Sequence, residues 1–538
     1  MARAKHAKQT QSDWSTQTVI TILPPASTSS LKVDAGGAFN GVQSNANLGA
    51  FNGLNNGGGN GNGQSNLGAF NGNRNTGDFN GNANTGAFNG VLNVGSENGN
   101  FNFGAFNGNF NGLPGGIGDG SFTERLLIGD LNQPPKHSVI QLASDATGFV
   151  AQLAIGDVAD LGQTMKGGND RISGGSNSKQ GIVLNVALGD AIEITGSAKG
   201  GRDSLTGGHN LGTGGVQNAM VGDAMLIADR GVAGNDCIVG GNNKSSGFVE
   251  NALIGDAFTL QDDARAGADF LRGGNSYGTG TTQNALLGDA ILVLDRATSG
   301  CDTLIGGDAW GSGLVQNAIF GDAAALGVNT SGGRDVLKGG NSRSTGNVEN
   351  VLFGDAALLM SATGGADYLS GGDSVSKGTV HNVLIGDGGV LTGNAEGGAD
   401  MLVGGNAKKG SVINVLIGDA CTLEWEGRAG EDILIAGNAS GRGASVQNYM
   451  WGDVVFSNQD TDMAADRFVF GNGAGASNFI MDFQLGLDTI AFDFDCPNNN
   501  PEIDTWFENG NTIVEAGDVC VTLVGFSGLL TEDSFLFV

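Results

Sequence analysis

The sequence predicts an all-β fold, a parallel β-solenoid of the β-roll or β-helix kind, with about ten 33-residue coils and a C-terminal β cap. Three features of the chain support this fold. A Gly-Asp dipeptide returns every 33 residues six times, and then at steps of 32, 32 and 34. Apolar and polar residues alternate within each repeat, and glycine makes up 98 of 538 residues. A fixed period of this length indicates stacked units that bury their apolar faces on one another.

Each repeat contains three short extended segments. In the repeat that begins at Gly332 they are residues 335–340, 348–355 and 356–362. Their apolar residues recur at every second position, which is the period of a β-strand. Gly-Gly and Gly-Asp pairs separate the segments and mark corners, where the backbone takes a positive φ or closely approaches the next coil.

Composition divides the chain into four regions. Residues 1–35 form a polar leader, 36–112 a Gly/Asn/Phe nonapeptide-like repeat, 113–455 the 33-residue array and 456–538 the cap. An atypical last region is expected because the final coil must cover an open sheet edge. Two interpretations of residues 36–112 remain open. One is disordered low-complexity sequence, and the other is a narrow solenoid with Phe inside and Asn at its corners.

Two columns of aspartates run in phase through the array. In stacked coils the neighbours within a column lie ~4.8 Å apart, and carboxylates that close repel by about 1 kcal/mol in water and more at a protein surface. A row of Ca²⁺ ions answers this charge most simply, since Ca²⁺ prefers carboxylate and carbonyl oxygens. The residues expected to bind it are Asp170, Asp203, Asp236, Asp269, Asp302, Asp335, Asp367, Asp400, Asp432 and Asp466 of the G-x-D column, and Asp190, Asp223, Asp256, Asp289, Asp322 and Asp355 of the G-D-A column.

A second interpretation of these columns needs no metal. Each aspartate would then cap its own turn through a hydrogen bond from the side chain to the backbone. A column of asparagines runs in the same phase and is expected to form an amide ladder along the solenoid axis. Its members are Asn185, Asn218, Asn251, Asn284, Asn317, Asn350, Asn382, Asn414 and Asn448.

Charge and composition argue against several classes of function. Acidic residues outnumber basic ones by 55 to 26, which disfavours binding to nucleic acid and favours cations. The five cysteines have no disulfide or metal spacing. No apolar run is long enough to span a membrane. The four histidines are isolated, and neither a G-x-S-x-G elbow nor a P-loop is present, so we expect a protein that is not an enzyme.

The repeats resemble those of the repeats-in-toxin (RTX) family, the hemolysin-type calcium-binding repeats of secreted bacterial proteins. Residues 398–405, G-A-D-M-L-V-G-G, are similar to the family's nonapeptide G-G-x-G-x-D-x-U-x. Asp482, Phe483, Gly486, Asp488 and Ile490 match the D-F-x-x-G-x-D-x-I segment that closes such arrays. The acidic and then apolar residues 532–538 resemble the family's uncleaved signal for type I secretion. The resemblance implies a parallel β-roll with Ca²⁺ in its turns.

This chain also departs from the family pattern, because its coil has 33 residues and one nonapeptide-like piece, whereas the family packs two nonapeptides into an 18-residue coil. Its N-terminal segment lacks the apolar stretch of a secretory signal peptide, which fits export through the type I machinery. We expect a secreted or cell-surface structural or adhesive protein that folds on Ca²⁺ after export. Cell-surface polysaccharide and a second copy of the chain are the candidate partners. The alternative is a metal-independent β-solenoid that acts as a carbohydrate-binding module or a fibre subunit.

Overall fold

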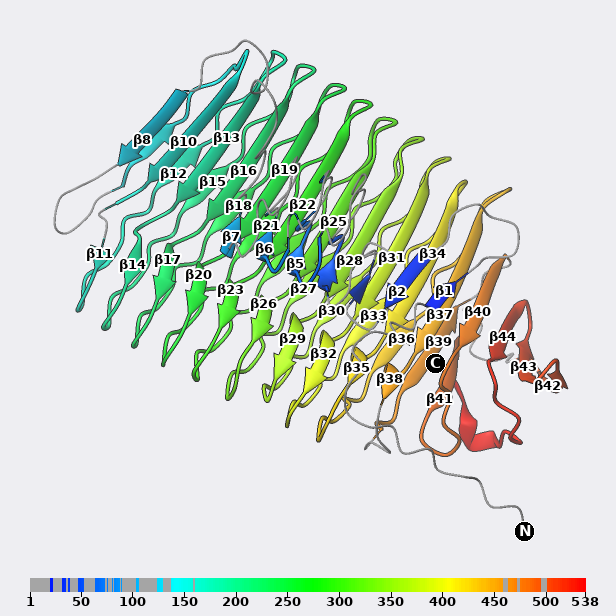
Figure 1. The fold of residues 1–538 in the computed structure, drawn as a ribbon. Coiled ribbons are helices and arrows are strands. Elements are labelled where there is room, and N and C mark those ends of the chain that lie inside the picture. Colours follow the sequence, from blue (N-terminus) through cyan, green and yellow to red (C-terminus); the bar gives the residue numbers. More distant parts are fainter. Residues whose placement is uncertain are drawn as a thin grey trace.

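The computed structural model describes residues 137–157, 160–457, 463–471, 475–494 and 501–538, together with shorter pieces between residues 20 and 128. These residues form strands and one short 3₁₀-helix, η1 (Glu532–Ser534). The predicted fold class is confirmed, since parallel strands stack coil upon coil into a long solenoid (Figure 1). In the described part of the chain, no helix has the length and apolar character needed to cross a membrane.

Three sheets run along the solenoid axis, and one coil contributes one strand to each. Sheet 1, with the longest strands, contains β8 (Thr123–Ile128), β10 (Phe149–Ile155), β13 (Ile182–Leu188), β16 (Gly215–Val221), β19 (Phe248–Ile254), β22 (Thr281–Leu287), β25 (Val315–Phe320), β28 (Val348–Phe353), β31 (Thr379–Ile385), β34 (Ser411–Ile417), β37 (Ser445–Trp451), β40 (Ala476–Ile480), β44 (Val519–Leu523), β43 (Asn511–Ala516) and β42 (Ile503–Glu508).

The other two sheets have shorter strands. Sheet 2 contains β9 (Val139–Gln141), β12 (Arg171–Ser173), β15 (Ser204–Thr206), β18 (Cys237–Val239), β21 (Phe270–Arg272), β24 (Thr303–Ile305), β27 (Val336–Lys338), β30 (Tyr368–Ser370), β33 (Met401–Val403), β36 (Ile433–Ile435), β39 (Arg467–Gly471), β41 (Thr489–Asp493) and β45 (Phe535–Phe537). Sheet 3 contains β11 (Asp160–Leu161), β14 (Glu193–Ile194), β17 (Ala224–Ile227), β20 (Ala257–Leu260), β23 (Ala290–Val293), β26 (Ala323–Leu326), β29 (Ala356–Met360), β32 (Gly388–Thr392), β35 (Ala420–Leu423) and β38 (Val454–Ser457).

Each coil visits the sheets in the order 1, 3, 2 and then steps up to the next coil. Register follows the sequence period, so that Asn185 of β13 pairs with Asn218 of β16 and Leu205 of β15 pairs with Ile238 of β18. Leu205 and Ile238 are fully buried and pack between sheets 1 and 2 in one long apolar core. The equivalent residues of every coil therefore stack on one another, and any side chain that recurs in sequence forms a row in space.

The central strands of sheet 1, from β16 to β34, are buried on both faces of the sheet. In β16 all seven residues are buried, with Met220 in the core between sheets 1 and 2, and Ala219 and Val221 in a second cluster on the outward face. Strands that are covered on both sides read as near-continuous apolar runs. Phe51 and Phe70 of the N-terminal segment belong to the same cluster as Ala219 and Val221 and help to cover the outward face.

The N-terminal segment contributes a fourth sheet, which lies along the outward face of sheet 1 (Figure 1). Its strands are β1 (Ile20–Ile22), β2 (Leu31–Asp34), β3 (Gly37–Ala38), β4 (Leu48–Ala50), β5 (Leu67–Ala69), β6 (Thr85–Ala87) and β7 (Phe103–Ala105). Strands β3 to β7 are parallel and in register. Phe51 stacks on Phe70 with ring centroids 4.8 Å apart, and the Asn71 backbone N–H donates to Asn52 Oδ1 at 2.8 Å. The described strands β3 to β7 thus stack in register, so that equivalent residues of successive repeats lie on one another.

The C-terminal region closes the solenoid at its other end. Strands β40 and β41 continue sheets 1 and 2, β44 pairs with β40 in parallel, and β43 and β42 then turn antiparallel. Phe468, Phe470 and Phe492 extend the apolar core into this region. The last strand, β45, pairs with β41, and the ring centroids of Phe537 and Phe492 are 5.9 Å apart. This region is the β cap that the sequence predicts.

Candidate metal centre

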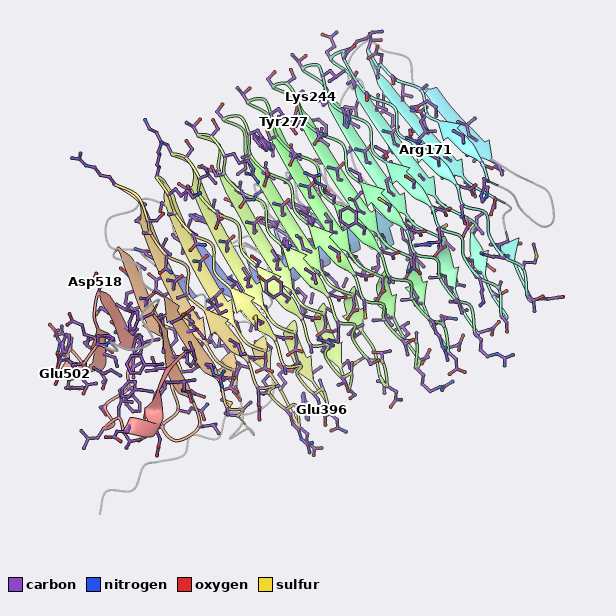
Figure 2. All side chains as sticks on the ribbon, turned by 180° about the vertical axis from the view of Figure 1, so that it is seen from behind. Arg171, Lys244, Tyr277, Glu396, Glu502 and Asp518 are labelled. Carbon is purple, nitrogen blue, oxygen red and sulfur yellow. The ribbon has the colours of Figure 1, made fainter. Side chains whose placement is uncertain are left out.

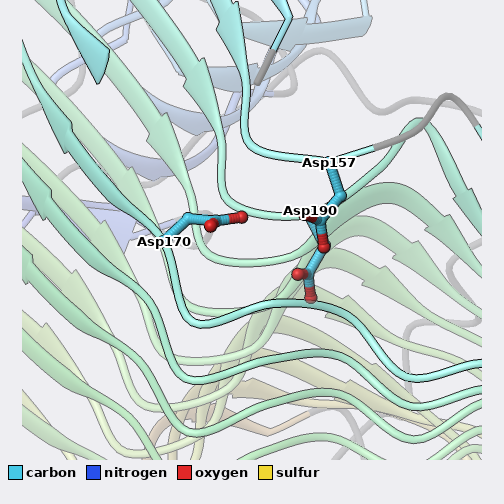
Figure 3. Close-up of side chains that lie close together, drawn as sticks. All are labelled: Asp157, Asp170 and Asp190. Atoms are coloured by element: carbon cyan, nitrogen blue, oxygen red, sulfur yellow. The ribbon is translucent and has the colours of Figure 1, made fainter. Parts of the chain in front are cut away.

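The two aspartate columns meet inside the solenoid. Each aspartate of the G-D-A column follows a strand of sheet 1, and each aspartate of the G-x-D column precedes a strand of sheet 2. Figure 3 shows the side chain of Asp170, which directly precedes β12 of sheet 2, pointing toward Asp157 and Asp190, which follow strands of sheet 1. One carboxylate oxygen from each of these three residues lies within 4.8 Å of the others, and Asp190, Asp203 and Asp223 form an equivalent group one coil further along. The sequence indicated two separate columns, whereas the fold makes them one site.

Every residue expected to bind Ca²⁺ is buried. The carboxylates of the G-D-A column are fully buried, and those of the G-x-D column are at most 3% exposed. Four further aspartates extend the G-D-A column at both ends and are buried in the same way, namely Asp157, Asp387, Asp419 and Asp453. The columns therefore lie in the interior and not at a solvent-exposed corner, and their negative charge must be neutralised there.

In the G-x-D column, one oxygen of each carboxylate is used by the backbone of the neighbouring coil. The backbone N–H of Asp203 donates to Asp236 Oδ1 at 2.6 Å, and that of Asp236 donates to Asp269 Oδ1 at 2.6 Å. The same bond recurs coil by coil up to Asp466. The second oxygen, Oδ2, of Asp203, Asp236 and Asp269 is buried and has no hydrogen-bond partner.

In the G-D-A column, Asp190 and Asp223 are half-satisfied in the same manner. The backbone N–H of Gly201 donates to Asp190 Oδ2 at 2.5 Å, and that of Gly234 donates to Asp223 Oδ2 at 2.7 Å. The Oδ1 atoms of Asp190 and Asp223 are buried without a hydrogen-bond partner. Turn capping thus explains one oxygen of Asp190 and of Asp223 and leaves the other unexplained. In the central coils the capping N–H reaches both carboxylate oxygens, as at Asp256, Asp289 and Asp322.

The glycine of the G-D-A motif is required by this close approach. A Cβ atom at Gly189 would meet both the carbonyl oxygen of Gly222 in the next coil and Oδ2 of Asp203 in the facing column. Gly222 stands in the same relation to the Gly255 carbonyl and to Asp236. The motif therefore lets the main chain touch the facing carboxylate, and it places carbonyl oxygens beside the unpartnered carboxylate oxygens.

The asparagine column shows what a fully satisfied interior row looks like in this protein. Asn218 Oδ1 accepts from the Gly208 N–H at 2.8 Å and from Asn185 Nδ2 at 2.9 Å. Asn218 Nδ2 donates to the Gly208 carbonyl at 3.2 Å and to Asn251 Oδ1 at 2.8 Å. The neutral amides thus border the core between sheets 1 and 2 along one side of every coil, and all of their hydrogen bonds are made. Half-bonded carboxylates border its other side.

Burial and mutual repulsion strongly favour the neutral form of these carboxylates. Burial, reinforced by the charges of Asp190 and Asp236, raises the pKa of Asp203 to about 11. Burial raises the pKa of Asp236 to about 7 and, with the charge of Asp453, that of Asp466 to about 8. The ion pairs seen among the described residues, such as Arg296–Asp263 and Arg428–Glu396, lie on the surface and do not involve the columns. Protons or metal cations must therefore neutralise the columns.

Without metal, the folded chain is expected to lose stability as the pH rises. A carboxyl whose pKa is raised in the folded state binds its proton more tightly there than in the unfolded chain. Its contribution to the free energy of unfolding is therefore complete below the unfolded pKa of ~3.9 and is lost as the pH rises through the folded pKa. For Asp236, Asp453 and Asp466 that loss begins above the unfolded value and is complete above folded pKa values of about 7, 6 and 8. Urea unfolding of metal-free protein is expected to show a lower midpoint at pH 8 than at pH 5. A higher midpoint at pH 8 would contradict buried, unpaired carboxylates.

Two aspartates of the cap continue the columns and were missed as site residues. The Gly452 N–H donates to Asp482 Oδ1 at 2.9 Å, and the Asp466 N–H donates to Asp488 Oδ1 at 3.1 Å. Burial raises the pKa of Asp482 to about 8 and that of Asp488 to about 6. The signal for them was the D-F-x-x-G-x-D-x-I segment, whose two aspartates take the places of a G-D-A and a G-x-D residue.

Comparisons with protein-family models, with curated proteins and with solved structures give no match to this chain. The assignment of function therefore rests on the geometry of the two columns.

Proposed function

We propose that the protein binds divalent cations, Ca²⁺ in the first place, in a file between its two aspartate columns, and that this binding drives folding of the solenoid. The observation that carries the proposal is the contrast between the two interior rows. The asparagines make all their hydrogen bonds, whereas Asp190, Asp203 and Asp223 each keep one buried oxygen without a hydrogen-bond partner. A buried charge is tolerated when it is paired or coordinates a metal.

The donor set fits a hard cation. Each coil supplies two carboxylates, so one divalent ion per coil neutralises the interior and removes 20 of the 55 acidic charges of the chain. Three carboxylate oxygens converge at Asp190, Asp203 and Asp223, and the Gly222 carbonyl oxygen lies beside them. Ca²⁺ takes six to eight oxygen ligands from carboxylates and carbonyls in flexible geometry. When bound, the ion supplies the positive charge that no side chain of the columns supplies.

The competing proposal is a metal-independent solenoid whose columns are neutralised by protons. The raised pKa values of Asp203 and Asp466 support it, because such carboxyls are protonated at neutral pH when no metal is present. Thermal unfolding of the full chain with Ca²⁺ and with excess chelator separates the two. A higher melting temperature in Ca²⁺ supports the metal file, and equal melting temperatures support the protonated columns.

We further propose a secreted or cell-surface, structural or adhesive role, reached by type I secretion. Residues 532–538 carry the expected order of acidic and then apolar residues, and they lie in η1 and β45 at the end of the cap. Columns that need Ca²⁺ remain unfolded where Ca²⁺ is scarce and fold where it is abundant. This order of events suits a protein that crosses a channel before it folds.

Deletion of the last twelve residues is expected to abolish appearance of the protein in the culture medium. Because β45 packs against β41 through Phe537 and Phe492, the deletion also weakens the cap. Phe537→Ala is the matched control, since it removes that ring contact and keeps the acidic-apolar terminus. Secretion of the control together with retention of the truncated chain supports the proposal. Truncated protein in the medium at the level of the intact chain contradicts it.

A further inference from the structure

One corner of the solenoid carries a row of basic and aromatic side chains that the metal file does not use. It lies between sheet 2 and the next strand of sheet 1, where the backbone forms one parallel bridge per coil. The residue after each bridge points outward, and Figure 2 shows Lys244 and Tyr277 on this rim. We call the residues that follow these bridges the corner row. Its exposed members are Ser178, Leu211, Lys244, Tyr277, Trp310, Arg343, Lys408 and Ser440, and the half-buried Val375 lies between Arg343 and Lys408.

The corner row is held in strict register by the backbone. The N–H of Tyr277 donates to the Asn243 carbonyl at 2.7 Å, and the N–H of Trp310 donates to the Ser276 carbonyl at 2.8 Å. Successive members are therefore one strand spacing apart, ~4.8 Å. Two positions further along, the loops of six successive coils carry an exposed hydroxyl or lysine, in the order Thr213, Ser246, Thr279, Ser312, Thr345 and Lys377. From Lys244 to Arg343 the corner thus presents two parallel rows, one cationic and aromatic and the other of hydroxyl groups.

The aromatic members are stacked along the axis and show their edges to solvent. Tyr277 and Trp310 are 47% and 48% exposed, and their rings stack at 6.2 Å between centroids. The Arg343 guanidinium lies 4.8 Å from the Trp310 ring centroid, from the coil on the other side. Aromatic edges carry the positive part of the ring quadrupole, and the Tyr O–H and Trp N–H add hydrogen-bond donors. The rim is therefore electropositive on a chain whose formal net charge is −29.

The acidic residues near the corner offset this charge in part, and the net positive charge of the row is carried by Lys244 and Lys408. Asp308 is used by Arg343 in a 2.6 Å ion pair. Asp373 hydrogen-bonds the Asn406 backbone N–H of the next coil at 2.7 Å, and Asp145 lies at the first coil. Further exposed basic residues flank the row at Lys179, Lys409 and Arg442.

We propose that the corner row binds a linear acidic polysaccharide laid along the solenoid axis, a site that is independent of the metal file. The cations and ring edges that occupy successive coils from Lys244 to Arg343 complement its anionic groups, and the hydroxyl row complements its sugar hydroxyls. The strand spacing of ~4.8 Å is close to the length of one sugar ring, so successive coils meet successive sugars. Single-stranded nucleic acid suits the rim less well. It binds aromatic residues through free ring faces, and both faces of Trp310 are taken by Tyr277 and Arg343.

The test measures binding of the calcium-saturated full chain to dextran sulfate, to unsulfated dextran and to an oligodeoxythymidylate. Wild type is expected to bind dextran sulfate, more weakly as salt rises, and not to bind dextran. Lys244→Gln with Lys408→Gln removes two exposed charges five coils apart, and Trp310→Ala removes the central ring. Each variant is expected to weaken binding by about tenfold or more, which corresponds to ~1.4 kcal/mol.

The matched control is Lys199→Gln with Arg230→Gln, which removes two exposed charges from the loops that connect sheet 3 to sheet 2, a different corner of the coil. It is expected to leave binding within about twofold of wild type, a change of ~0.4 kcal/mol. Melting temperatures equal to that of wild type verify that each variant is folded. The proposal is overturned if dextran sulfate does not bind, if the control weakens binding as much as the corner-row variants, or if the oligodeoxythymidylate binds as tightly as dextran sulfate.

Discussion

Removal of calcium is expected to lower the melting temperature of the chain by tens of degrees or to abolish its cooperative transition. A ligand that binds only the folded state at 1,000 times its Kd adds about 4 kcal/mol per site. The whole stability of a folded domain is about 5–15 kcal/mol. With one ion per coil, the summed binding free energy therefore exceeds the free energy of unfolding of a typical domain. Removing the ions is expected to destabilise the chain far more than an ordinary core substitution does.

The measurement is circular dichroism during heating, with Ca²⁺ and with excess chelator. Mg²⁺ is the matched ion control, because it dehydrates reluctantly and demands near-ideal octahedral geometry. We expect Mg²⁺ to restore less stability than Ca²⁺ in an interior where the column carboxylates are at most 3% exposed. Melting curves that coincide in Ca²⁺ and chelator would show that protons suffice.

Replacing the aspartate pair of one central coil is expected to change stability in opposite directions in the two buffers. Asp289 and Asp302 belong to the same coil, and both are buried carboxylates with raised pKa values caused first by burial. Asp289→Asn with Asp302→Asn keeps one side-chain oxygen at each position to accept from the Gly300 and Asp269 N–H groups. In chelator the variant should be more stable than wild type, since two buried carboxyls no longer need protons. In Ca²⁺ it should be less stable by about 4 kcal/mol, the contribution of one site.

The matched control places a charge where the structure has none. Asn284 lies in β22, the strand before Asp289, and its Nδ2 donates to the Gly274 carbonyl at 3.0 Å and to Asn317 Oδ1 at 2.8 Å. Asn284→Asp removes both donors and adds a buried carboxylate, so it should destabilise the chain in both buffers, by about 3–5 kcal/mol. Urea unfolding measures all three proteins. A change of the same sign in both buffers for the Asp289 and Asp302 double variant would rule out a cation at that coil.

The repeat period made the array of coils predictable in detail. The expected segments 335–340, 348–355 and 356–362 correspond to β27, β28 and β29, because alternation of apolar residues and Gly corners fixes both strand and register. Residues that share a place in the period stack in space, so the aspartate and asparagine rows also followed from sequence.

How the rows face one another could not be read from the period. Asp190 and Asp203 are 13 residues apart, and only the path of the chain through β14 and back brings their carboxylates together. The N-terminal docking was hidden for a similar reason. Ala219 and Val221 showed that both faces of sheet 1 are apolar, but nothing in their local pattern says which segment covers the outer one.

The most direct test of the cation file is a crystal structure of the full chain grown in calcium, with data collected where calcium scatters anomalously. A row of anomalous peaks between the facing carboxylates, about one per coil from Asp157 to Asp488, is the result that this interpretation requires. Empty density between carboxylates that share protons, in the same calcium-rich crystal, would contradict it.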